Sequence, residues 1–137
     1  PGTGLVSFGG LTTLRQSALV QNGGVGLDQR ARGASLVDDV VTAENVTLSG
    51  NGTSLDPQSA AQALSREVLE LRHATVVASA PTEVALLASA SGELRLAGSV
   101  IAGRCVALEA GEAPNVVSSG GNVEGAGDTC GLTLKRS

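Results

Sequence analysis

The residues with the clearest chemical potential are Cys105 and Cys130, the only two cysteines of the chain. A structural zinc site usually needs four Cys or His ligands, and the single histidine, His73, leaves the set short of four. Two interpretations remain for the pair, a disulfide and two buried thiols, and we favour the disulfide. In the chain-entropy model it would stabilise the fold by about 3.5 kcal/mol. It would also imply an oxidising compartment, because disulfides persist there.

The acidic residues are scattered along the chain rather than grouped. Glycoside hydrolysis needs convergent carboxylates, and calcium binding needs a cluster of carboxylate and carbonyl oxygens. Asp38 and Asp39 are adjacent, so in a strand they point to opposite faces. Glu67 and Glu70 lie elsewhere, and His73 has no Ser and acid pattern that would complete a triad. The sequence therefore predicts no catalytic residue, no cofactor-binding residue and no metal ligand.

The composition limits the kind of core that the chain can build. Its 137 residues suffice for a single domain, residues 1–137, and 42% of them are apolar. Phe8 is the one aromatic residue, and Tyr, Trp and Met are absent. The core must therefore consist of Val, Leu, Ile and Ala, which favours a narrow interior of stacked aliphatic side chains over a conventional sandwich.

The charge and the first residues of the sequence lead to expectations about binding partners, membrane insertion and processing. The net charge is −4 without any basic cluster, so we expect no nucleic-acid partner. No apolar run approaches the ~20 residues that a membrane span needs, and the opening "PGTGLVSFGG" is unlike a signal peptide. Because the chain begins at Pro1 rather than Met, we expect it to be a fragment or a processed piece of a larger protein.

An internal repeat organises most of the chain. Four nine-residue segments align without gaps, each with a small or polar start, a few β-formers and a small or polar end. They start at positions 14, 43, 71 and 96 of the sequence, an almost regular spacing. Alternating leucines in "LEL" and "LRL" indicate half-buried strands that precede two of them. The segments are "LRQSALVQN" (14–22), "AENVTLSGN" (43–51), "LRHATVVAS" (71–79) and "LAGSVIAGR" (96–104).

The repeat predicts an all-β fold of a particular kind. Three short strands with turns in about 25 residues form one rung, and stacked rungs pair in parallel to make a β-solenoid of about four to five rungs. One stretch departs from this pattern and has the features of a helix. Asp56 can cap a helix at its N-terminus, and Pro57 fits the first helical position. After them, Ala60, Leu64 and Val68 recur every four residues and give one apolar stripe. We expect a short helix near 57–65, a spacer on the solenoid wall or else a partner-binding protrusion.

Two groups of residues have predicted structural roles within this frame. Asn22 and Asn51 occupy the same repeat position, where asparagines can stack from rung to rung and tolerate left-handed turns. Near the end, "SSGGNVEGAGDTCGL" falls where a further rung should come, and Gly120, Gly121 and Asn122 supply a turn with positive φ. With Cys130 bonded back to the preceding rung, residues 105–132 would form a stapled terminal rung.

The late motifs resemble a known family. "ELRLAGSVIAGRC" followed by "VSSGGNVEGAGDTCGL" is similar to the C-terminal rungs of bacterial parallel β-helix proteins of the choice-of-anchor Q type, which are related in fold to pectate-lyase-like and polymorphic outer-membrane-protein repeats. The resemblance is loose from residue 11 and close from about 93. It is carried by Ser99, Val100, Ile101, Ala102, Gly103, Cys105, Ser119, Gly120, Gly121, Asn122, Cys130, Gly131 and Leu132.

The resemblance implies a right-handed parallel β-helix, secreted or displayed on a bacterial cell surface, in a family whose members mostly lack an assigned enzymatic role. Family members commonly continue past "CGL" toward a C-terminal anchor, whereas this chain ends at "TLKRS", so no anchor can be inferred.

Two classes of function follow from the sequence. The first is a non-enzymatic structural, adhesion or interaction module, whose open solenoid edges pair with a protein partner or with another copy, end to end. The alternative is a glycan-binding or polysaccharide-degrading β-helix domain, which would contact surface glycans. The fold alone cannot decide between them, because β-helices host both roles.

Overall fold

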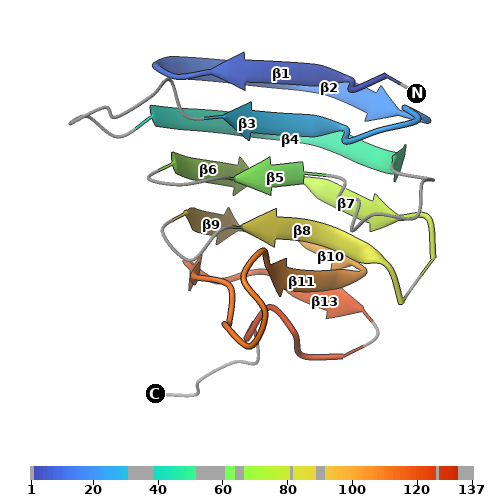
Figure 1. The fold of residues 1–137 in the computed structure, drawn as a ribbon, viewed down its shortest axis with the longest axis vertical. Helices are drawn as coiled ribbons and strands as arrows, with labels where there is room; N and C mark the ends of the chain where they lie inside the picture. Colours follow the sequence, from blue (N-terminus) through green and yellow to red (C-terminus); the bar gives the residue numbers. More distant parts are fainter. Residues whose placement is uncertain are drawn as a thin grey trace.

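The fold is all-β, as the repeat predicts. Thirteen strands and no helix occur in the part of the chain that the structure describes, and every pair of neighbouring strands there is parallel. They coil into a β-solenoid of about four turns (Figure 1). This computed structural model describes residues 2–30, 39–51, 61–63 (backbone only), 67–80, 82–88, 92–125 and 127–132.

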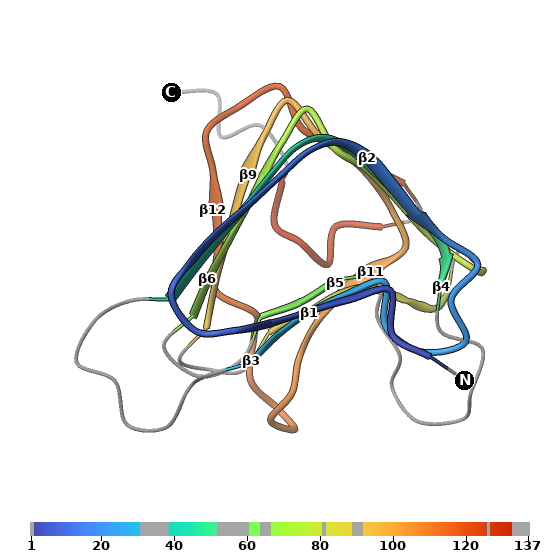
Figure 2. The same cartoon turned by 90° about the horizontal axis from the view of Figure 1, so that it is seen from above.

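Seen along its axis, the solenoid has a triangular outline with three walls (Figure 2). The first wall is a five-stranded sheet in the order β1, β3, β5, β8 and β11, so each strand comes from the next turn of the chain. Its strands are β1 (Leu5–Phe8), β3 (Leu27–Arg30), β5 (Ala61–Ala63), β8 (Val84–Ala88) and β11 (Arg104–Ala107).

The second and third walls belong to one continuous sheet, because β2 (Leu11–Val20) and β4 (Asp39–Asn51) are long enough to bend around the corner between them. In later turns each of these two walls has its own short strand. The second wall continues with β6 (Glu67–Arg72), β9 (Glu93–Ala97) and β12 (Val116–Ser118). The third wall continues with β7 (Thr75–Ala78), β10 (Val100–Ala102) and β13 (Val123–Gly125).

The coil is right-handed, as the family resemblance implied. In Figure 2 the N-terminal turn lies nearest the viewer, and the chain runs clockwise from the first wall through the second to the third while it recedes. This hand agrees with the strong preference for right-handed crossovers between parallel strands of one sheet.

The register of the strands confirms the repeat. Leu14 pairs with Ala43, Ala43 with Leu71, and Leu71 with Leu96. These are the first residues of the four aligned segments, so the spacing of the segments in the sequence is the length of the successive turns. Equivalent side chains therefore stack directly above one another along the solenoid axis.

The core is a set of aliphatic columns that run along this axis. Alternate residues of the second and third walls point inward, and those that form three of the columns are at most 1% exposed. Burying one such side chain fully stabilises the fold by about 1.5–3 kcal/mol, and no aromatic residue is needed because the interior is narrow. The three columns are Val41–Leu69–Leu94, Ala43–Leu71–Leu96 and Leu48–Val76–Ile101.

The helix predicted near 57–65 is wrong where the structure describes that stretch. Ala61–Ala63 form β5, which pairs in parallel with β3 on one side and β8 on the other. A central strand of a parallel sheet does not need the alternation of polar and apolar residues on which a sequence-based assignment depends. Residues 57–60, 64 and 65 lie outside the described residues.

We expect Leu71→Ala to lower the free energy of unfolding by about 2–5 kcal/mol, because it empties the middle of an aliphatic column between Ala43 and Leu96. Leu11→Ala is the matched control: the Leu11 side chain is 85% exposed, and its loss should change stability by less than about 0.5 kcal/mol. Urea denaturation followed by circular dichroism measures both. Equal losses for the two variants would contradict the columnar core.

Candidate functional site

The two cysteines form a disulfide, Cys105–Cys130, with a Cα–Cα distance of 4.9 Å. Cys105 lies in β11, in line with Leu86 of the preceding turn, and both half-cystines are buried within the core. The bond joins the last strand of the first wall to the segment that follows β13. Of the two interpretations of the sequence, the disulfide is therefore the one that the structure bears out.

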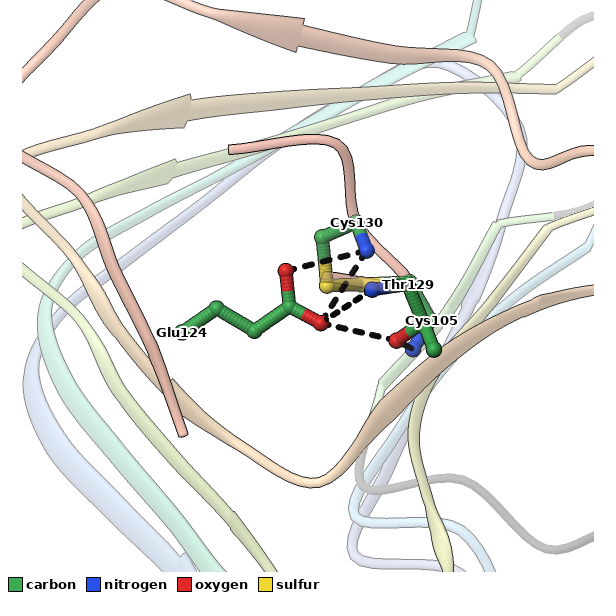
Figure 3. Close-up of a disulfide and its surroundings, with 4 residues drawn as sticks. All are labelled: Cys105, Glu124, Thr129 and Cys130. Atoms are coloured by element: carbon green, nitrogen blue, oxygen red, sulfur yellow. Dashed lines mark hydrogen bonds between the residues drawn. A yellow bond between two sulfur atoms is a disulfide. The ribbon is translucent and has the colours of Figure 1, made fainter. Parts of the chain in front are cut away.

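A hydrogen-bond network that the sequence analysis missed surrounds the disulfide (Figure 3). The Glu124 carboxylate accepts from the backbone N–H groups of Thr129 at 2.6 Å and Cys130 at 3.0 Å, and from the Thr129 hydroxyl at 2.8 Å. The Thr129 Oγ1 accepts in turn from the backbone N–H of Cys105 at 2.9 Å. Such bonds to a carboxylate are about twice as strong as neutral ones, so the network holds the segment in place together with the disulfide.

This segment covers the C-terminal end of the solenoid. Its last described residues lie within the triangular outline in Figure 2. Cys130 and Leu132 are only 4% and 8% exposed and belong to the hydrophobic core. We call residues 127–132 the C-terminal cap, because Cys130 and Leu132 within this segment are buried against the core at the last turn.

The three residues of the predicted terminal turn have two different roles. Gly120 and Gly121 adopt the predicted positive φ, at 96° and 69°. Asn122 does not have a positive φ, and its role in the turn is the hydrogen bonding of its side chain. Its Oδ1 accepts from the Ser99 N–H at 2.8 Å, and its Nδ2 donates to the Leu96 carbonyl at 2.9 Å. Asn122 thus joins the last turn to the turn before it.

A column of left-handed residues forms the corner between the second and third walls. Gln16, Asn45, His73 and Gly98 have φ of 48°, 53°, 50° and 57°, and all four occupy the third position of their aligned segments. Gly121 continues the column, because a Cβ on it would lie 3.4 Å from the Gly98 Cα. Left-handed geometry costs a non-glycine residue about 1–2 kcal/mol, which the ladders on both sides of the corner offset.

Asn22 and Asn51 meet across adjacent turns. The Asn51 Oδ1 accepts from the Asn22 backbone N–H at 3.0 Å and from its Nδ2 at 2.9 Å. The Asn51 Nδ2 donates to the Leu19 carbonyl at 2.8 Å, and the Ser79 hydroxyl of the next turn donates to the Asn51 carbonyl at 3.3 Å. These contacts join three turns at the corner that follows the third wall.

The remaining histidine and glutamate side chains that the sequence offered as candidates are exposed to solvent or paired with arginines on the outer face. His73 is an exposed corner residue. Glu70 pairs with Arg72 at 2.7 Å on the outer face of the second wall, and Glu44 of the turn above pairs with Arg15 at 3.2 Å. Glu93 and Arg95 form a further pair there.

Two carboxylates point into the solenoid instead of outward. Asp39 and Glu67 are register partners on neighbouring turns, and both are buried. The Asp39 carboxylate accepts from the Gly10 N–H. Asp38 lies outside the described residues. Among the residues that the structure describes, no three His, Cys, Asp or Glu side chains are grouped so that they could hold a metal ion.

Strands at both ends of the described solenoid have a neighbour on one side only, and at the C-terminal end these are β11, β12 and β13. β1 pairs only with β3 and β2 only with β4, so the described residues provide no neighbour on the outer side of either strand. Large apolar side chains are exposed on this turn, with Leu11 at 85% and Phe8 at 61%. The Arg30 guanidinium lies 6.0 Å from the Phe8 ring centroid, and its hydrogen bond to the buried Asp28 raises the pKa of Arg30.

The backbone groups that face this open edge can be assigned. The outward-pointing Val40 donates its N–H to the Gly10 carbonyl of the turn above, whereas the inward-pointing Leu94 donates to Asn115 of the turn below. Side-chain and N–H directions both alternate along a strand, so outward residues direct their N–H and C=O toward the preceding turn. In β2 the groups of Leu11 and Thr13 therefore face the open edge.

The arrangement defines a right-handed parallel β-solenoid that carries the cap at its C-terminal turn. No family model, no curated protein and no solved structure matches the chain. In the part of the chain that the structure describes, no helix has the length and apolar character to cross a membrane.

We expect reduction of the disulfide, or Cys130→Ser, to increase amide hydrogen exchange in residues 105–132 before any other part of the molecule. The cap would then depend on the Glu124 network alone, while the columns around Leu94 stay packed. Glu124→Gln keeps the disulfide and weakens the bonds to Thr129 and Cys130, so it should have a smaller effect in the same region. Unchanged exchange there after reduction would contradict this role of the bond.

We expect Gly98→Ala to lower the free energy of unfolding by about 1–2 kcal/mol, since alanine is strained at this φ. Its Cβ would also lie 2.8 Å from the His73 Nδ1 and force the imidazole to move. Gly125→Ala is the control, because that glycine lacks positive φ and its Cβ would meet neighbours at 3.8 Å or more. Thermal or urea denaturation compares the two, and equal stabilities would refute the role of the left-handed corner.

Proposed function

We propose that this chain is a non-enzymatic β-solenoid module with a structural or interaction role, which binds another protein chain by strand addition at its N-terminal end. The observation that carries the proposal is the open edge of β1 and β2, which have a strand neighbour on one side only among the described residues. Such an edge presents unpaired N–H and C=O groups that a partner strand satisfies.

The side chains of this turn support the same role. Leu5, Leu14 and Leu19 point toward the core but are only partly buried, because no turn lies above them in the described structure. A partner strand with apolar residues at alternate positions would extend the aliphatic columns by one layer. Burial of this apolar surface would add to the backbone hydrogen bonds, at roughly 25 cal/mol per Å².

The charge at the edge favours one kind of partner strand. Arg15 pairs with Glu44, which occupies the same repeat position one turn below. A partner strand with an acidic residue at that position would meet Arg15 from the other side. The module thus recognises a strand that resembles its own turns.

The disulfide and the family resemblance both support a location outside the cytoplasm. A disulfide is typical of proteins from oxidising compartments. Together with the resemblance to choice-of-anchor Q proteins, it supports secretion or display on a bacterial cell surface. The glycan-active alternative remains a prediction of the sequence, since none of the contacts described above favours it.

A labelled peptide with the sequence of β4, residues 39–51, tests strand addition directly. We expect it to bind the intact protein in fluorescence anisotropy, and a peptide with Glu44→Arg to bind more weakly because it would meet Arg15 with a like charge. Thr13→Pro should abolish binding: it removes an N–H that faces the open edge and breaks no ladder bond, and proline is tolerated in edge strands.

Thr13→Val, which keeps the N–H group, is the matched control and should bind the peptide like the unaltered protein. Circular dichroism establishes that both variants are folded. The proposal fails if a scrambled peptide binds equally well, or if Thr13→Pro leaves binding unchanged.

A further inference from the structure

Two stretches of the chain have the N-x-S/T pattern that oligosaccharyltransferases recognise in secreted proteins. They are "NVT" (45–47) and "NGT" (51–53), and both asparagines belong to β4. The pattern alone does not distinguish them, because each has an asparagine amide two residues before a threonine hydroxyl. The structure distinguishes them, since the two asparagines have opposite surroundings.

Asn45 lies at the left-handed corner between the second and third walls, and its side chain is exposed. No hydrogen bond joins this amide to any described part of the chain. The strand register also skips the residue: β2 pairs with Glu44 and then with Val46, and the next turn pairs with Glu44 through β6 and with Thr47 through β7. The amide nitrogen can therefore be substituted without the loss of a contact.

The threonine of this site is accessible together with the asparagine. Thr47 is exposed on the outer face of the third wall, whereas Val46 between the two is 3% exposed and belongs to the core. Asn45 has a φ of 53°, a left-handed conformation that asparagine adopts more often than most residues. An enzyme that approaches the corner from solvent thus meets both the amide and the hydroxyl.

The corner also has room for a bulky substituent. Successive turns of a parallel sheet lie about 4.8 Å apart. The neighbours of Asn45 along the corner are Gln16 in the turn above and His73 in the turn below, and both are exposed. This corner is one vertex of the triangular outline in Figure 2, so a group attached there projects away from both walls.

Asn51 is in the opposite situation. Its side chain is only 3% exposed. The Nδ2 atom, to which a glycan would be attached, donates to the Leu19 carbonyl at 2.8 Å, and the Oδ1 atom accepts from the Asn22 Nδ2 at 2.9 Å. A glycan on this nitrogen would have to leave a buried corner and would separate adjacent turns. Residue 53, the threonine of this second pattern, lies outside the described residues.

We propose that Asn45, and not Asn51, is the acceptor of an N-linked glycan. The donor is an oligosaccharide carried on a polyprenyl diphosphate. A bond forms between the Asn45 Nδ2 and the anomeric carbon of the sugar, while the bond from that carbon to the diphosphate oxygen breaks. The lipid diphosphate leaves with the electron pair, and the amide loses one proton. This modification occurs in secreted proteins, in agreement with the Cys105–Cys130 disulfide.

Expression of the chain through a eukaryotic secretory pathway tests the assignment. Peptide N-glycosidase F removes N-linked glycans and leaves an aspartate at the acceptor position, which peptide mass spectrometry then locates. We expect one glycan, at position 45. Asn45→Gln and Thr47→Ala should each abolish the modification. Thr47→Ser keeps the recognised hydroxyl and is the matched control, and circular dichroism checks that all three variants are folded.

Thr53→Ala removes the second pattern and should leave the glycan at position 45 unchanged. An unmodified Asn45 in the secreted, oxidised protein overturns the assignment. A glycan at Asn51 in that protein, alone or beside one at Asn45, overturns the distinction between the two sites. None of these results depends on strand addition at β2, so the proposed function stands or fails separately, by the binding of the β4 peptide.

Discussion

The constraint that shapes this molecule is the direction of its backbone hydrogen bonds. In a parallel solenoid almost every strand N–H and C=O points along the axis, so each turn depends on the turn above and the turn below. The pairing of Leu14, Ala43, Leu71 and Leu96 satisfies these groups and at the same time stacks the inward side chains into columns. A turn that lacks a neighbour leaves backbone groups and part of its apolar face without a partner. In the described residues β1, β2, β11, β12 and β13 each have a strand neighbour on one side only, and at the last turn Cys130 and Leu132 are buried against the core.

The outer faces reinforce the register that the columns set. On the second wall, Arg15 lies beside Glu44 and Glu44 beside Arg72 in successive turns, so the sign of the charge alternates along the axis. A shift of two residues along one strand would keep the apolar residues inward but would break this alternation. Each exposed pair contributes little to stability, and its larger effect is to penalise wrong registers.

The sequence was sufficient to predict the features that repeat, because a repeated position leaves the same signal several times. The four aligned segments, the alternating leucines of β6 and β9, and the all-β class follow from it. The left-handed corner had a weak signal too, since Asn45, His73 and Gly98 are residue types that adopt this geometry more often than others, but Gln16 is not, and it masks the pattern. β5 was missed because apolar residues spaced by four suggest a helix, and only the strands on both sides of Ala61–Ala63 decide otherwise. The contacts of Glu124 were beyond prediction, as an acid six residues from a cysteine is common and only the fold brings it to the Thr129 and Cys130 amides.

The contacts of the terminal residues have a consequence for how such a molecule changes in length. Asn122 contacts Leu96, Ser99 and Ser118, and Thr129 and Cys130 contact Cys105, so these contacts involve only the last two described turns. None of them depends on how many turns precede. Turns inserted or deleted upstream would leave these contacts intact, because each turn contacts only its neighbours. The number of turns and the contacts of the cap are thus separate properties, and duplication of a turn can alter the first without disturbing the second.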